Sequence, residues 1–297
     1  MAGCLMTKPQ RSFTALFVVG VLIWWSPILA TTRLACGGGE HTHILLILPI
    51  TAALILSDLK ARRNAFQPCV GTAVLLLSFS LCLVAFGYLK PAFISDELRL
   101  SVSMFGLVVW WLGSFLLCFG VGAFRHFLFP LCLLFWLVPF PAVALTSIIH
   151  FLQEQSAFAA RMLFLAINVP ARQAGVVVSI PNLEIEVAPQ CSSIRSSLML
   201  VISTMVLGHL FLRSWKRQLI LTAATIPLSI LKNGLRIVVI AELGTRVDIG
   251  FLDGRLHHNG GIVFFAIALA AVAALLLGLQ RGETQKPVNL ISPSSLL

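Results

Sequence analysis

The sequence has few charged side chains. Only 11% of its 297 residues are Asp, Glu, Lys or Arg, whereas 58% are hydrophobic, and the mean hydropathy is +0.97. Soluble globular domains carry about 25% charged residues. This shortage excludes a soluble enzyme, a secreted disulfide scaffold and a disordered chain. It leaves a protein that crosses a membrane many times.

Cysteine and histidine are also sparse, and their pattern excludes two common kinds of site. The seven cysteines are an odd number, and most lie within apolar runs, which argues against a disulfide framework. His41 and His43 form an HxH pair, but a metal site would need further ligands. We expect neither a metal nor another cofactor.

Long apolar runs dominate what is present. A helix needs about 20 apolar residues to cross the hydrocarbon core of a bilayer. The sequence predicts an all-α, polytopic membrane helical bundle with about eight transmembrane helices. The predicted spans are Phe13–Leu29, His43–Leu56, Val70–Leu89, Leu100–Val121, Phe127–Ile149, Ser193–Leu212, Leu219–Leu243 and Gly260–Leu279.

The net charge is +10, and the distribution of the basic residues between the loops indicates the orientation of these spans. With the N-terminus in the cytoplasm, the inner segments hold eleven bases and two acids, and the outer segments hold seven bases and nine acids. This satisfies the positive-inside rule and predicts that both termini are cytoplasmic. The basic excess therefore needs no nucleic acid, and the lipid bilayer is the expected partner.

The longest segment between spans runs from about His150 to Gln190, on the predicted outer side. Its first half mixes apolar and polar residues and could lie along the interface as an amphipathic helix. Its second half is rich in β-branched residues and alternates between apolar and polar positions, with Pro181-Asn182 as a turn signal. This pattern predicts a small extracytoplasmic hairpin. We expect a single domain over residues 1–297, with a flexible cytoplasmic tail over 280–297.

The seventh predicted span contains Lys232, Asn233 and Arg236 close together. Ionisable residues within membrane spans are costly and are functional candidates. Asn233 and Arg236 are three residues apart and so share one face of the helix. The alternative to a functional role is that Lys232 and Arg236 are basic side chains that extend along the helix and place their charges at the membrane–water interface.

Cys191 differs from the other six cysteines because it stands just before a predicted helix. The positive end of the helix dipole and Arg195, four residues on, are expected to favour its thiolate form. His257 and His258 lie at the outer mouth of the last span, where either could act as a general acid or base.

The predicted topology brings Cys191, Arg236 and His257 to the same outer side of the membrane. A cysteine supplies a nucleophile, a histidine carries a proton, and an arginine offers positive charge to a developing oxyanion. These are the parts needed for acyl transfer through a thioester.

Three motifs in this half of the chain resemble the exosortase/archaeosortase family of membrane cysteine transpeptidases. They are AxxCSxxRS, present as APQCSSIRSS from Ala188; NxxRI, present as NGLRI from Asn233; and HxxxGxxxF, formed by His257, Gly261 and Phe265. They occur in order within residues 175–265. Ser193 and Gln190 depart from the usual pattern, which leaves the subfamily open.

The resemblance implies a role for each matching residue. Cys191 would be the nucleophile, Arg236 the oxyanion-stabilising arginine and His257 the acid/base, with Arg195 and Asn233 in support. The implied substrate is a membrane-anchored protein with a C-terminal sorting signal, made of a short motif (Pro-Glu-Pro in the bacterial PEP-CTERM group), a transmembrane helix and a basic end. The implied location is a prokaryotic plasma membrane, with the active site on the extracytoplasmic side.

Two other classes fit parts of the sequence. A polytopic transporter could use Lys232, Asn233 and Arg236 to bind its substrate, and Cys191 would then be dispensable. An exopolysaccharide or lipid-linked assembly protein can also be basic and polytopic. Such a protein would usually show an acidic metal-binding motif such as DxD at a membrane face, and the sequence has none.

Overall fold

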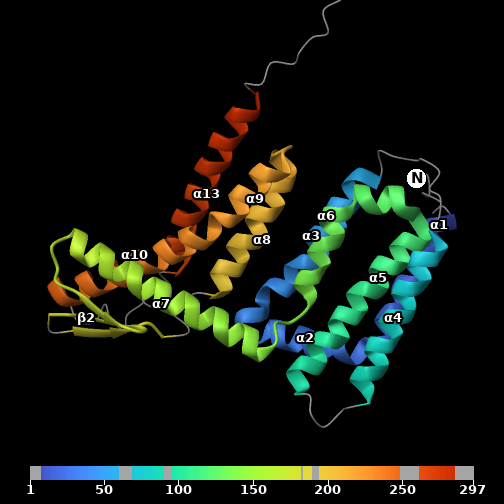
Figure 1. Cartoon of the computed structure of the whole chain (residues 1–297), viewed down its shortest axis with the longest axis horizontal. Helices are drawn as coiled ribbons and strands as arrows, with labels where there is room; N and C mark the ends of the chain where they lie inside the picture. The colour runs from blue at the N-terminus through green and yellow to red at the C-terminus, as the bar shows by residue number, and fades with distance from the viewer. Residues whose placement is uncertain are drawn as a thin grey trace, which may run out of the picture. The chain divides into compact units, whose positions relative to one another are not determined.

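The computed structural model describes residues 8–59, 69–89, 95–181, 183–188, 194–247 and 261–284. The chain divides into two compact units, Met1–Thr146 and Ser147–Leu297. Both are largely helical, and unit 2 also contains a small antiparallel sheet (Figure 1).

The described part of unit 1 is helical. Its central helix is α5. In the apolar 18-residue stretch of α5, 78% is buried inside the protein, compared with 22% in the corresponding stretch of α4. The elements are α1 (Lys8–Ile23), α2 (Trp25–Cys36), η1 (Glu40–His43), α3 (Ile44–Leu59), α4 (Val70–Tyr88), α5 (Asp96–His126), α6 (Leu128–Leu133) and η2 (Leu134–Leu137).

Helix α5 is closely packed because of its small residues. A Cβ atom on Gly113 would lie 3.1 Å from the Cβ of Leu76, and one on Gly106 would lie 3.3 Å from the Cβ of Leu83. Glycine at these two positions therefore lets α4 and α5 run side by side, as Figure 1 shows. Gly120, with a φ of 75°, interrupts α5 one residue before the predicted end of the fourth span.

Two predicted spans are bent in the structure. Helices α1 and α2 meet at an angle of 76°, and the segment Leu128–Leu137 meets α7 (Ala142–Ala166) at 97°. Pro139 and Pro141 explain the second bend, because proline removes a backbone donor. The span predicted over Phe13–Leu29 is therefore bent, and the one predicted over Phe127–Ile149 is broken at prolines that its own sequence contains.

Helix α7 is longer than the sequence suggested. It continues without interruption from Ala142 to Ala166, through the residue where the fifth span was predicted to end. The predicted amphipathic segment after Ile149 is thus the second half of this helix. It is not a separate element.

The number of membrane-spanning helices agrees with the prediction. Within the described residues, six helices are long and apolar enough to cross a membrane, or up to eight if each bent pair forms one span. The polytopic helical class is therefore confirmed.

Unit 2 contains most of α7, a three-stranded sheet and the last helices of the chain. The predicted hairpin is confirmed, and a further short strand, β1, precedes it in the sheet order β1-β2-β3. Both strand pairs are antiparallel, with Gln173 opposite Val178 and Ile185 also opposite Val178. The elements are β1 (Arg172–Ala174), β2 (Val177–Ile180), β3 (Leu183–Glu186), α8 (Ile194–Phe211), α9 (Trp215–Ala223), α10 (Thr225–Arg246) and α13 (Gly261–Thr284).

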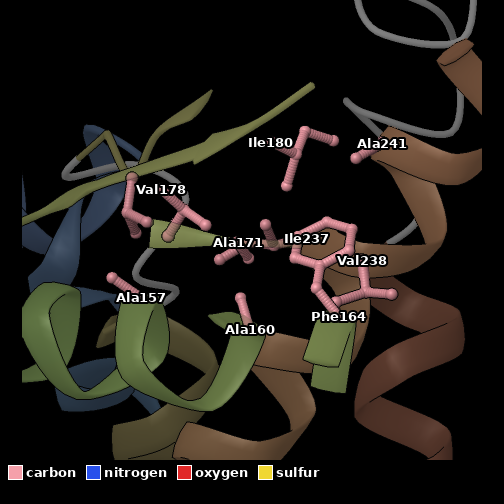
Figure 2. Close-up of a cluster of buried hydrophobic side chains, with 10 residues drawn as sticks. Ala157, Ala160, Phe164, Ala171, Val178, Ile180, Ile237, Val238 and Ala241 are labelled. Carbon is pink, nitrogen blue, oxygen red and sulfur yellow. The ribbon is translucent and has the colours of Figure 1, made fainter. Parts of the chain in front are cut away.

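One apolar cluster joins the sheet to α7 and α10. Figure 2 shows β2 above α7, with side chains from α10 filling one side of the space between them. Burying a side chain such as Val178 or Phe164 stabilises this contact by about 1.5–3 kcal/mol. The buried residues are Ala157, Ala160, Phe164, Ala171, Val178, Ile180, Val187, Ile237, Val238 and Ala241.

A second apolar cluster joins α8, α9 and α13, which lie close together in Figure 1. Its buried residues include Leu200, Leu221 and Val272. Arg217 of α9 donates hydrogen bonds to the carbonyl oxygens of Leu279 and Gly282, 2.6 and 2.8 Å away. These bonds hold the last turns of α13 against α9.

Candidate active site

The structure describes three of the five candidate site residues. Asn233 and Arg236 lie on α10, and Arg195 lies in the first turn of α8. Cys191 and His257 fall outside the described residues, as does His258. The site is therefore built here from the segments that flank Cys191 and from α10.

Helix α10 carries a group of polar side chains in a turn that faces the protein interior. Asn233 is 1% exposed and Lys232 is 7% exposed, while Arg236, one turn further on, is half-buried. Residues three or four positions apart on a helix are neighbours, so these three side chains share one region of α10. The structure thus brings together the polar residues that stood out in the seventh predicted span.

Gly234 fixes how closely α10 approaches α7. A Cβ atom at Gly234 would lie 2.8 Å from the Cβ of Ala159 and 3.0 Å from the backbone nitrogen of Ala160. No real side chain tolerates such distances without movement of the helices. The glycine therefore allows the turn that carries Asn233 and Arg236 to pack directly on the backbone of α7.

The segment that leads to Cys191 is also anchored on α7. Gln153 is 8% exposed, and its Nε2 donates a hydrogen bond of 2.6 Å to the carbonyl oxygen of Val187. The amide of Val187 in turn donates to the carbonyl oxygen of Val176. Val187 is buried in the apolar cluster that joins the sheet to α7 and α10, four residues before Cys191.

A second glutamine ties the opposite edge of the sheet to α7. The Nε2 of Gln173 in β1 donates to the carbonyl oxygen of Glu154, 3.1 Å away, and to that of Gly175, 2.8 Å away. Gln153 and Glu154 are adjacent on α7, so one turn of this helix holds both edges of the sheet. These hydrogen bonds therefore hold the sheet on α7, and the chain continues from the last strand toward Cys191.

After Cys191 the chain enters α8, and the first turn of this helix contacts α10. Lys232 Nζ donates a hydrogen bond to the hydroxyl of Ser196. Ser196 is the third residue of α8, and Lys232 precedes Asn233 in α10. One polar contact thus links the helix that follows the cysteine to the turn that leads to Arg236.

Arg195 is the candidate supporting residue that lies nearest to Cys191 in the sequence. Its side chain is exposed in the first turn of α8, and no hydrogen bond or ion pair joins it to another residue in the described ranges. The prediction that Arg195 supports the cysteine stays a prediction, because Cys191 lies outside those ranges.

Three residues of this region were not found by sequence reasoning: Gln153, Ser196 and Gly234. Ser196 lies within the motif APQCSSIRSS and Gly234 within NGLRI, so their place in the motifs was the available signal. Gln153 had no such signal, because its partner Val187 lies 34 residues away in sequence.

The histidine pair of unit 1 serves packing in the structure. His43 is buried, its Nδ1 lies 3.1 Å from the carbonyl oxygen of Glu40, and its ring contacts those of Trp136 and Phe140. Within the ranges that the structure describes, no group of three or more His, Cys, Asp or Glu side chains could hold a metal ion.

Comparison with known proteins identifies the family of the chain. A family model described as transmembrane exosortase matches residues 24–274, which cover most of both units and include all three sequence motifs. No curated protein and no solved structure matches the chain.

Proposed function

Since the chain belongs to the transmembrane exosortase family, we propose that it is a membrane cysteine transpeptidase that cleaves C-terminal sorting signals from exported proteins. Its substrate would be a membrane-anchored protein with a PEP-CTERM-like tail, in which a short motif precedes a transmembrane helix and a basic end. Cleavage would release this tail and transfer the exported protein to an acceptor.

The observation that carries this proposal is the contact, within unit 2, between the segments that carry two of the three motifs, APQCSSIRSS and NGLRI. Gln153 holds the strand exit before Cys191, and Lys232 holds the first turn of the helix after it. The same turn of α10 carries Asn233, with Arg236 one turn further. This arrangement favours a site in which a cysteine acts beside an arginine.

The reaction would follow from these residue types. The Cys191 thiolate attacks the scissile carbonyl carbon, and the Arg236 guanidinium stabilises the resulting oxyanion. The C–N bond then breaks, and the tail leaves as an amine that takes its proton from protonated His257, or from His258. Asn233 would orient Arg236, and Arg195 would support the thiolate.

The second half of the reaction regenerates the enzyme. An acceptor nucleophile, or water, gives its proton to the histidine and attacks the thioester carbonyl carbon. The C–S bond breaks, the exported protein leaves joined to the acceptor, and the thiolate is free again. The protein would need no metal and no organic cofactor for these steps.

We further propose that the site faces the extracytoplasmic side of a prokaryotic plasma membrane, with both termini in the cytoplasm. The distribution of bases supports this orientation. The family match extends over both units, which supports a single functional domain over residues 1–297 with its catalytic motifs in 175–265.

Replacement of the nucleophile tests the proposal. A reporter with a sorting tail should be cleaved in membranes that contain the wild-type chain and left intact with Cys191→Ala. Cys118→Ala, which changes a cysteine within α5, is the matched control and should cleave normally. Cleavage by Cys191→Ala would contradict the proposal, because it would show that Cys191 is not the nucleophile.

A further inference from the structure

The ends of α8, α9 and α13 meet at one end of unit 2. The Nε2 of Gln280 in α13 donates a hydrogen bond of 3.4 Å to the carbonyl oxygen of Phe211, the last residue of α8. Arg217 of α9 donates to the carbonyl oxygens of Leu279 and Gly282, near the end of α13. These partners lie 62 to 69 residues apart in sequence, so it is the fold that brings the three helix ends together.

This end of unit 2 is strongly basic. It carries a group of four residues that we call the basic cluster: Arg213, Lys216 and Arg217 around the start of α9, and Arg281 in the last turn of α13. Arg217 is half-buried, whereas the other three are exposed. The only acidic residue in segments 207–223 and 276–284 is Glu283. Like charges gathered in this way repel one another, and a bound anion would relieve the repulsion.

On both helices, an exposed base lies close to exposed apolar surface. On α9, Trp215 is 67% exposed beside Lys216, and Leu219 is exposed in the next turn. On α13, Leu277 is exposed one turn before Arg281. Exposed apolar side chains of a membrane protein lie against the acyl chains, and tryptophan favours the boundary between acyl chains and headgroups. The bases of the cluster therefore lie at the level of the lipid headgroups.

These two features together indicate the chemistry of the ligand. The basic cluster requires a negative charge, and the apolar surface beside it requires a hydrocarbon chain. A free phosphate ion or an acidic peptide would supply only the charge. The predicted orientation places this end on the cytoplasmic side, where basic pockets between membrane helices attract acidic lipid headgroups. An acidic phospholipid therefore matches the charge, the apolar surface and the predicted side of the membrane.

We propose that the basic cluster binds the phosphate group of an acidic phospholipid, whose acyl chains lie along the exposed apolar surface of α9 and α13. The two hydrogen bonds of Arg217 build this site, since they hold the end of α13, with Arg281, against α9. Arginine presents a planar set of donors that suits a phosphate, and Lys216 adds a point charge. The site is independent of peptide cleavage, because none of the four residues takes part in the proposed reaction.

Native mass spectrometry of the full-length chain in a neutral detergent measures the binding. The probes are phosphatidylglycerol and phosphatidylcholine with the same acyl chains. We expect an apparent Kd for phosphatidylglycerol about a hundredfold lower than that for phosphatidylcholine, because each base near the headgroup favours the acidic lipid by about fivefold. The double variant Lys216→Gln with Arg281→Gln should therefore lose about 25-fold in affinity for phosphatidylglycerol and keep the wild-type affinity for phosphatidylcholine.

Two further pairs of substitutions separate the site from the total charge. Arg172→Gln with Arg246→Gln removes the same charge from exposed bases of unit 2 outside the cluster, so this matched control should bind phosphatidylglycerol as wild type does. Lys216→Arg with Arg281→Lys keeps both charges and should keep the preference. The melting temperature of each variant without added lipid shows that it folds. If the first pair does not fold, either of its single substitutions decides the question in the same way.

A competition experiment distinguishes a lipid from a free ion. Inorganic phosphate at millimolar concentration should not displace phosphatidylglycerol, because the ion has no acyl chains; displacement would overturn the inference. Equal binding of the two lipids by the wild-type chain would also overturn it, as would a preference that persists in Lys216→Gln with Arg281→Gln. An equal loss in Arg172→Gln with Arg246→Gln would show that only the total charge matters, and would overturn it too.

Discussion

The Nε2 of Gln153 on α7 donates a hydrogen bond of 2.6 Å to the carbonyl oxygen of Val187, at the exit of the sheet and four residues before Cys191. Both residues are buried. A carbonyl group that loses its donor in such a place pays its full desolvation cost. The side chain of Gln153 is therefore expected to fix the path of the chain toward the nucleophile.

Gln153→Leu tests this expectation. The variant keeps the approximate volume but leaves the Val187 carbonyl without this donor, at a cost of about 1–3 kcal/mol. We expect tail cleavage to fall by about tenfold or more, because a displaced nucleophile loses its attack geometry. Initial rates in membranes, normalised to the amount of folded protein, measure this effect.

Gln173→Leu is the matched control for that variant. It removes two hydrogen bonds at the opposite edge of the sheet, to Glu154 and Gly175, and leaves the Val187 contact in place. It should lower the melting temperature and preserve more of the activity than Gln153→Leu does. Equal losses of activity in both variants would show that Gln153 serves only the stability of the sheet.

Gly234→Ala is expected to separate α10 from α7. The added methyl group would lie 3.0 Å from the backbone nitrogen of Ala160, which cannot move independently of its helix. Overpacking of this kind costs about 1–3 kcal/mol. We expect a lower melting temperature in detergent and a loss of cleavage, because the same turn carries Asn233 and leads to Arg236.

A glycine with open space around it provides the comparison. Gly278 of α13 has nothing within 4 Å of an added Cβ, so Gly278→Ala should leave stability and cleavage unchanged. Ala159→Gly in the Gly234→Ala background removes the closest contact, at 2.8 Å, and should restore part of the stability. An unaltered Gly234→Ala protein would mean that α7 and α10 are further apart than described.

Arg236→Lys should be a poor substitute for the wild-type residue. Lysine keeps the charge but lacks the planar set of donors that arginine presents to an oxyanion. Loss of an oxyanion donor typically costs 10²–10³ in kcat, so we expect a fall of about a hundredfold in kcat for tail cleavage. The measurement is a single-turnover rate with the reporter tail.

Arg246→Lys is the control at the end of the same helix. Arg246 forms an exposed ion pair with Glu242, at 2.6 Å, and such a pair contributes little. Its replacement should leave the rate unchanged. A wild-type rate in Arg236→Lys would indicate that Arg236 only extends toward the membrane interface.

The proposed topology predicts which side of the membrane Cys191 faces. In single-cysteine variants, a membrane-impermeant thiol reagent should label Cys191 and Cys36 in intact cells, since both belong to predicted outer segments. Cys4, in the predicted cytoplasmic tail, should be labelled only in inside-out vesicles. Labelling of Cys191 only in such vesicles would reverse the orientation.

Hydropathy was sufficient to find the straight helices. The predicted span Val70–Leu89 corresponds to α4, and Ser193–Leu212 corresponds to α8 within one residue at each end. These helices expose apolar surface to lipid, so their length follows from the thickness of the bilayer. The hairpin was found because its strands alternate around Pro181-Asn182.

The features that the sequence did not predict depend on tertiary contacts. The bend between α1 and α2 occurs at Trp24, which is fully buried and packs on Trp110, although Pro27 in the first turn of α2 is a local signal for such a break. Strand β1 has three residues and no clear alternation. The partners of Gln153 and Lys232 lie 34 and 36 residues away, beyond the reach of any local pattern.

The most direct test of the central claim is the capture of an acyl-enzyme on Cys191. The full-length chain in lipid nanodiscs is mixed with a membrane-anchored reporter that carries a sorting tail, quenched in acid and analysed by mass. We predict an adduct equal to the reporter without its tail, joined to Cys191 and released by hydroxylamine as a thioester. Tail cleavage that proceeds with no such adduct on Cys191, or an adduct that persists in Cys191→Ala, would contradict the account.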